Sequence, residues 1–117
     1  MNPIPKALRQ ELSEDEYYKK CCLTGLTRYK IDFHHALCYK GAQINEKWNI
    51  LPVVWLKHSQ EGDTNSIHNC KRTKDIAELI ALRRADEKVF VRYAKAKFAQ
   101  RLKYLEKKYG REGDWNI

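Results

Sequence analysis

The chain has 117 residues, of which 43% are hydrophobic, and it carries a formal net charge of +8. This length allows one domain with a modest core, and the hydrophobic content argues against a disordered chain. There is no run of 18 apolar residues, and the N-terminal residues are too polar for a secretory signal. We therefore expect one cytoplasmic domain, residues 1–117, with no membrane partner.

Residues 1–21 are predicted to form an N-terminal helical arm. Pro3 and Pro5 open the segment, and a short helix follows up to residue 12. Ser13 with Glu16 three residues later matches a capping box, in which the Ser side chain caps the first turn of a new helix. We expect that helical turn to run through residues 17–20.

Residues 22–70 are predicted to hold two strands and a short helix. Tyr29, Ile31 and Phe33 alternate with polar residues, which indicates a half-buried strand that ends near His35. A loop follows, and residues 48–56 are β-branched and aromatic, as strands prefer. Pro52 argues that this second strand is short or lies at an edge. A short helix near residue 56 and a polar loop over 59–66 would complete the unit.

Residues 71–110 are predicted to be a long basic helical region. Residues 71–111 hold 14 Lys and Arg against 5 Asp and Glu, whereas the rest of the chain holds 9 against 10. Such a local excess suits a polyanion, most often nucleic acid. Thr73 or Asp75 could cap the helix, and either one bent helix or two helices fit the pattern. An apolar stripe steps by three and four and would also allow a homodimer: Val91, Ala94, Phe98, Leu102, Leu105 and Tyr109.

The spacing of four polar residues within the strand unit carries the most chemical information. His34 and His35 end the first strand, Asn49 opens the second, and His58 follows it. A hairpin would bring these strand ends together, and adjacent strand residues point to opposite sides. One histidine could therefore hold a divalent metal while its neighbour faces a water. Neutral imidazole is a good general base near pH 7, and a metal ion can polarise a phosphodiester.

Four short runs of sequence resemble the HNH nuclease family, also called the ββα-metal or His-Me finger, and most closely its phage-encoded, recombination-associated branch. They are Cys22-Leu23-Thr24-Gly25, Asp32-Phe33-His34-His35, Asn49-Ile50-Leu51-Pro52 and His58. The resemblance implies that His34 and His58 are metal ligands, His35 the general base and Asn49 a loop support, with His35 and Asn49 the catalytic pair. It covers about residues 5–90, with the motif core at 22–68. The two CxxC pairs that bind zinc in many members are missing, so the four cysteines are expected to be free thiols.

Other residues keep open roles at this point. His68 suits a third metal ligand, a phosphate contact or a solvated loop residue. Asp32 could orient an imidazole or pair with a lysine. Several basic side chains of the C-terminal region are candidate nucleic-acid contacts: Arg83, Arg84, Lys88, Arg92 and Lys95.

These observations predict an α+β fold, with a β-hairpin and helix surrounded by helices and a long basic C-terminal helical region. The expected function is a metal-dependent DNA endonuclease that hydrolyses phosphodiester bonds with one Mg²⁺, Mn²⁺ or Zn²⁺ ion on duplex or branched DNA. If the chain is phage-encoded, it would act in the host cytoplasm. The alternative is a non-catalytic DNA-binding accessory protein of phage recombination or replication, and a third option is a zinc-stabilised interaction module.

Overall fold

The strand predicted to end at His35 is β1, Ile31–His35, which pairs antiparallel with β4, Ile50–Val54, in the computed structural model. The register places His34 opposite Leu51 and His35 opposite Ile50. With a second small sheet and several helices around this pair, the fold is α+β, as predicted. The structure describes residues 3–27, 30–58, 66–93, 95–110 and 115, apart from the side chains of Glu87 and Lys95.

The segment between the two strands is more ordered than the loop predicted from the sequence. It contains a second antiparallel pair, β2 at Cys38–Tyr39 and β3 at Ala42–Gln43, followed by the 3-10 helix η2 at Lys47–Asn49. The tight turn between β2 and β3 has Lys40 at φ 52° and Gly41 at φ 78°. Glycine adopts this left-handed conformation at no steric cost, so Gly41 permits the turn.

All five residues of β4 are buried, and the strand is short and lies at an edge of its sheet, as Pro52 indicated. Val53 and Val54 are fully buried and belong to the main hydrophobic core. Pro52 has no N–H to donate, but its carbonyl accepts a hydrogen bond from the Cys22 backbone at 2.9 Å. The strand is at an edge of its sheet, as proline requires, yet the chain before β1 covers that edge.

The short helix α2, Trp55–His58, follows β4 directly. The Ile67 N–H donates to the Lys57 carbonyl at 2.7 Å, so the chain returns to α2 just before His68. Most of the polar loop predicted over 59–66 lies outside the described residues, and Ser66 is buried.

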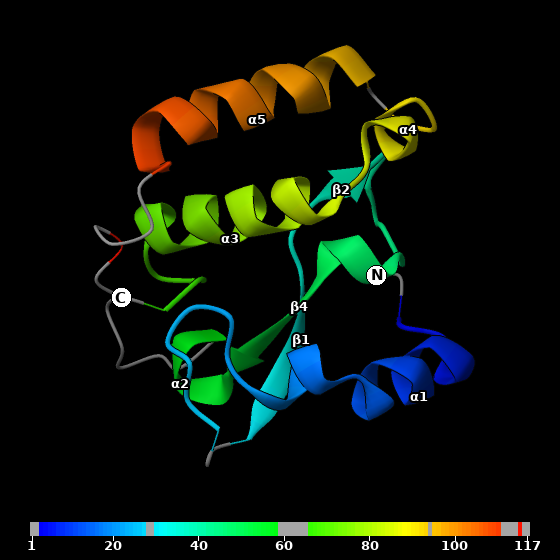
Figure 1. Ribbon diagram of the computed structural model, residues 1–117, viewed down its shortest axis with the longest axis vertical. Coiled ribbons are helices and arrows are strands. Elements are labelled where there is room, and N and C mark those ends of the chain that lie inside the picture. Colours follow the sequence, from blue (N-terminus) through cyan, green and yellow to red (C-terminus); the bar gives the residue numbers. More distant parts are fainter. Residues whose placement is uncertain (1–2, 28–29, 59–65, 94, 111–114, 116–117) are drawn as a thin grey trace.

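The basic C-terminal region is three helices rather than one long helix: α3 at Lys71–Arg84, α4 at Glu87–Phe90 and α5 at Lys95–Tyr109. Figure 1 shows α5 lying along α3, with the β1–β4 pair on the other side of α3. The prediction that Thr73 or Asp75 caps this region was wrong, because both lie inside α3 and are buried. Asp75 instead pairs with Arg101 of α5 at 2.8 Å.

The apolar stripe of α5 is used within the chain. Phe98 and Leu105 are buried in the core that α3 also lines. Val91, the first residue of the predicted stripe, precedes α5 and is 64% exposed. The part of the stripe that lies on α5 therefore packs within this chain, although the sequence also allowed it to form a homodimer contact.

The N-terminal segment packs on the sheet through α1, Lys6–Glu14, and the 3-10 helix η1, Glu16–Lys19. Leu12 and Tyr18 are buried with Ile50 in a second small core. The capping box predicted at Ser13 was wrong: Ser13 lies within α1, and its hydroxyl donates to the Gln10 carbonyl at 2.7 Å. Asp15 caps the following turn, because its carboxylate accepts the Tyr17 N–H at 2.9 Å.

Candidate metal centre

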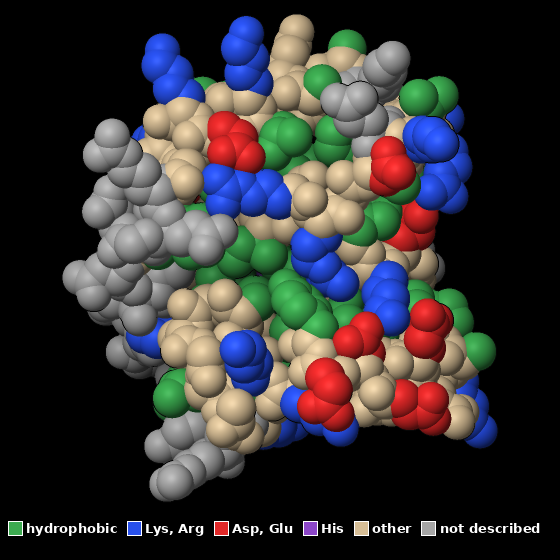
Figure 2. Space-filling view, viewed as in Figure 1, with side chains coloured by type: hydrophobic (Ala, Val, Ile, Leu, Met, Phe, Trp, Pro, Cys, Tyr) green, Lys and Arg blue, Asp and Glu red, His purple; other side chains and the backbone are tan. Residues whose placement is uncertain are grey.

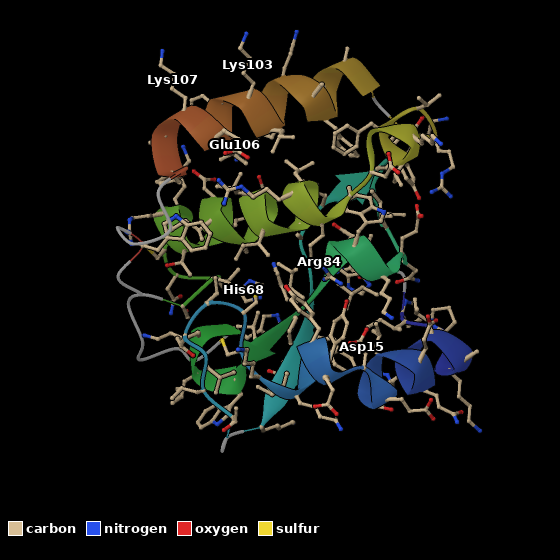
Figure 3. The ribbon with its side chains drawn as sticks, in the orientation of Figure 1. Asp15, His68, Arg84, Lys103, Glu106 and Lys107 are labelled. Atoms are coloured by element: carbon tan, nitrogen blue, oxygen red, sulfur yellow. The ribbon has the colours of Figure 1, made fainter. Side chains whose placement is uncertain are left out.

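Three histidines come together beside β1 of the β1–β4 pair. His34 lies on β1, and His58 ends α2, which continues from the paired strand β4. His68 follows Ile67, whose backbone is hydrogen-bonded to α2. Figure 3 shows His68 below α3 and above α2, on the inner side of both. The pairing of β1 with β4, the position of α2 beside β1 and the Ile67–Lys57 hydrogen bond thus bring the three imidazoles together.

The three histidines are close enough to share one metal ion. One ring nitrogen of each of His34, His58 and His68 lies within 4.8 Å of the others. The ring centroids are 5.2 Å apart for His34 and His58, 5.0 Å for His58 and His68, and 6.1 Å for His34 and His68. In a tetrahedral site with metal–nitrogen bonds of 2.0–2.1 Å the ligand nitrogens lie about 3.4 Å apart, so the three rings would have to approach one another by up to about 1.4 Å to share one ion.

Asp32 determines which nitrogen of His58 is available to a metal. The Asp32 carboxylate lies 3.2 Å from Nδ1 of His58. An ionised carboxylate only accepts hydrogen bonds, so Nδ1 carries the proton and Nε2 keeps its lone pair. Carboxylates bound to histidine in this way orient the ring and raise its strength as a ligand. Of the two roles open to Asp32, the structure shows the hydrogen bond to an imidazole.

The surroundings of His34 and His68 favour the neutral imidazole ring. Burial lowers the pKa of His34 to about 3, with further lowering from His58 and His68. Burial also lowers the pKa of His68, together with the charges of His58 and Lys74. Metal ions bind the unprotonated ring, so His34 is ready to donate at neutral pH without first losing a proton.

His35 lies beside the cluster and lines the same cavity. The cavity measures about 350 Å³ and is lined by His34, His35 and His68 together with Lys74 of α3. The Nε2 atom of His35 lies 2.6 Å from the side-chain oxygen of Asn45. A fourth imidazole and a cation therefore lie beside His34 and His68 in one partly open hollow, which Glu78 of α3 also lines.

Asn49 supports the loop between the strands and does not line the cavity that holds His35. Its carbonyl oxygen accepts the Leu37 N–H at 2.8 Å, and its amide group donates to the Leu37 and Ile44 carbonyls, both at 2.9 Å. The side chain is fully buried. These bonds use both of its N–H groups and its oxygen within the loop, so Asn49 acts on the site by holding the loop rather than by touching a substrate.

The basic residues predicted to contact nucleic acid are largely engaged inside the protein. Arg84 donates to the Ile50 carbonyl at 3.0 Å and to the Tyr18 hydroxyl at 2.8 Å. Arg83 forms a two-point contact with Glu106 at 2.7 and 2.8 Å and lowers the pKa of that carboxyl. In Figure 3, Arg84 points from α3 toward the strands and Glu106 points from α5 toward α3. Both arginines join elements of the fold, which the sequence pattern did not reveal.

The other three predicted contacts differ from one another. Arg92 pairs with Glu46 at 3.0 Å but remains 60% exposed. Lys88 is exposed, and the side chain of Lys95 lies outside the described residues. Arg92 and Lys88 are therefore accessible, although neither lines the cavity of the histidine cluster.

Sequence reasoning missed three polar residues that the structure places at or beside the site: Lys74 and Glu78, which line the cavity, and Asn45. Lys74 lies in the first turn of α3, six residues after His68, and reaches the cavity because α3 packs across the strand end. A helix start close behind His68 was the only signal for it. Asn45 has no comparable signal, because its approach to His35 depends on the turns of the intervening loop.

No protein-family model, curated protein or solved structure gives a significant match to this chain. Among the residues that the structure describes, no helix has the length and apolar character needed to cross a membrane. The chemistry of the cluster and the charge of the surface are therefore the basis for assigning a function.

Proposed function

We propose that the chain is a metal-dependent DNA endonuclease of the HNH type. The observation that carries this proposal is the convergence of His34, His58 and His68, whose ring nitrogens lie within 4.8 Å of one another, with His34 and His68 lining a cavity that His35 also lines. Three histidines leave further coordination positions for water or phosphate oxygens, as catalytic metal sites do. The order of β1, β4 and α2 also agrees with a ββα-metal arrangement, in which a hairpin and a helix supply the ligands.

The polar side chains of the site have distinct roles in the proposed hydrolysis. His34, His58 and His68 hold the divalent ion, which supplies positive charge for the scissile phosphate and the departing oxygen. His35 accepts the proton of the attacking water. Asp32 holds the His58 ring through Nδ1. Lys74 lines the same cavity as His35 and supplies a second cation for a phosphate oxygen.

The direct test is nicking of supercoiled plasmid DNA by the purified protein. We expect nicks with added Mg²⁺, Mn²⁺ or Zn²⁺, and no nicks when EDTA is in excess. His58→Ala removes a ligand, so it should lower both the metal-induced rise in melting temperature and the rate of nicking, by about 10-fold or more. Lys57→Ala changes the preceding residue of α2, leaves the three histidines intact and serves as the matched control.

Other outcomes of this test identify the alternatives. Salt-sensitive DNA binding without nicking under any of the three metals would contradict the nuclease proposal and favour an accessory DNA-binding protein. Unfolding of the protein by EDTA alone would favour a zinc-stabilised interaction module. Nicking that continues unchanged in excess EDTA would show that the reaction does not need a metal ion.

The surface proposed to hold the DNA backbone is the outer face of α5. Lys97, Lys103 and Lys107 on this helix are exposed, and none forms an ion pair among the described residues. Figure 2 shows Lys and Arg side chains projecting from the edge that α5 forms, and in Figure 3 Lys103 and Lys107 point away from α3. Lysines of this kind bind phosphates without reading the base sequence.

Replacing Lys97, Lys103 and Lys107 together by glutamine should weaken DNA binding and its dependence on salt. Each lost phosphate contact lowers the slope of log K against log salt by about 0.9, so the triple variant should lose roughly two to three units of slope. Binding is measured by fluorescence anisotropy on a labelled duplex over a salt series. The control replaces Lys6, Lys20 and Lys30, which are exposed on other parts of the chain, with the same change in net charge. An equal effect in both triple variants would show that net charge, and not the α5 face, controls binding.

A further inference from the structure

Asn45 makes two hydrogen bonds that join the candidate base to the N-terminal segment. Its side-chain oxygen lies 2.6 Å from Nε2 of His35. Its amide nitrogen donates to the Pro3 carbonyl at 2.9 Å. Pro3 and Asn45 are 42 positions apart in the sequence, and no motif connects either of them to His35.

The Pro3 carbonyl determines the orientation of the Asn45 amide and, through it, the protonation of His35. A backbone carbonyl only accepts hydrogen bonds, so the NH₂ group of Asn45 must face Pro3. The carboxamide oxygen then faces His35, and it also only accepts. The hydrogen in this contact therefore belongs to Nε2 of His35, and the neutral ring has its lone pair on Nδ1.

The position of Asn45 is itself held from both sides. The carbonyl of the preceding residue, Ile44, accepts a hydrogen bond from the buried Asn49 amide at 2.9 Å. On the other side, Ile4 and Leu8 pack against the small core of Leu12, Tyr18 and Ile50, which anchors the N-terminal segment that carries Pro3. In Figure 1 the N-terminus lies beside the helix that precedes β4, in agreement with this contact.

We infer that Asn45 is a positioning residue that holds His35 with Nδ1 free to accept the proton of the attacking water. This inference rests on the proposed nuclease function, in which the Nδ1 lone pair of His35 accepts a proton from water. Asn45 does not line the cavity that His34, His35 and His68 share, so it acts only through His35. The N-terminal segment before α1 then becomes part of the catalytic unit through the Pro3 carbonyl.

Two substitutions at position 45 separate positioning from a merely structural role. Asn45→Leu keeps the approximate shape but removes the acceptor, so kcat should fall about 10–100-fold, the cost typical of a lost orienting partner, while KM for plasmid changes little. Asn45→Asp keeps an acceptor for His35 but loses the donor to the Pro3 carbonyl, so its kcat should fall clearly less than that of Asn45→Leu. Gln10→Leu, which removes an exposed amide on α1, controls for the loss of a surface carboxamide. Wild-type kcat in Asn45→Leu, or equal losses in both position-45 variants, would overturn the inference.

Nuclear magnetic resonance gives a readout that does not need an active enzyme. In the wild-type protein without metal, a slowly exchanging ring N–H proton of His35 should be bonded to Nε2. Asn45→Asp should keep this signal, and Asn45→Leu should lose it. A proton on Nδ1 in the wild-type protein overturns the inference even if Asn45→Leu fails to fold. If the His35 proton is found on Nε2 but the protein does not cleave DNA, the contact between Asn45 and His35 is supported. In that case only the nuclease proposal is contradicted.

Discussion

Replacement of His35 by alanine is expected to reduce plasmid nicking by about 10²–10⁴-fold, the contribution typical of a general base. His35 is the one histidine outside the three-residue cluster, yet it lines the same cavity. Its substitution removes the proton acceptor without removing a metal ligand. The rate is measured on supercoiled plasmid under the metal that supports the fastest wild-type nicking.

Metal binding distinguishes His35 from its neighbour His34. His35→Ala should keep the metal-induced rise in melting temperature, whereas His34→Ala should lose both that rise and the nicking activity. DNA affinity should be unchanged in His35→Ala, because the exposed lysines proposed to hold the backbone lie on α5. Wild-type nicking by His35→Ala would refute the assignment of the base, and loss of metal binding would place His35 among the ligands.

Replacement of Asn49 by leucine is expected to destabilise the fold by about 3–5 kcal/mol, since unpaired buried polar groups cost about 1–3 kcal/mol each. The change leaves the Leu37 N–H and the Leu37 and Ile44 carbonyls without the partners that Asn49 supplies. Domains of this size have free energies of unfolding of roughly 5–15 kcal/mol, so the loss is a large share of the total. Urea denaturation followed by circular dichroism measures it.

Asn45→Leu provides the matched comparison, because it removes an asparagine side chain from the same loop. Asn45 is only partly buried, so its loss should cost about 1 kcal/mol or less while reducing kcat. The two asparagines should thus differ in kind: one mainly determines stability and the other mainly determines turnover. If Asn49→Leu unfolds at the wild-type urea midpoint, the loop does not depend on the buried amide.

The parts of the site that the sequence predicted are those built by local chain geometry. β1 was visible in the alternation of Ile31 and Phe33 with polar residues, and the structure ends it at His35 as expected. His34 lies near one end of the β1–β4 pair and α2 begins at the other, so His58 comes close to His34 because α2 turns back along β1, where it also meets Asp32. The support role of Asn49 also agrees with its hydrogen bonds to the loop.

The parts that could not be predicted depend on contacts between distant segments. Arg84 was read as a surface cation, but its partners are 34 and 66 positions away, at Ile50 and Tyr18. Asp75 was read as a helix cap, but Arg101 of α5 binds it within the core of the helix pair. Charge counts and periodicity describe one element at a time, so they do not show which charges are used to join two elements.

The internal contacts of Arg84 have a consequence for scanning mutagenesis. Its guanidinium donates hydrogen bonds to Ile50 of β4 and Tyr18 of η1 and stacks over the Tyr17 ring at 4.2 Å. Alanine at this position therefore removes contacts that join α3, β4 and η1. Loss of DNA binding in an Arg84→Ala protein would then be a false positive, caused by misfolding and not by a missing phosphate contact. A survey of basic residues on this protein should therefore score each variant for folding before it is scored for affinity, and arginines that bridge helices should be analysed as a separate group.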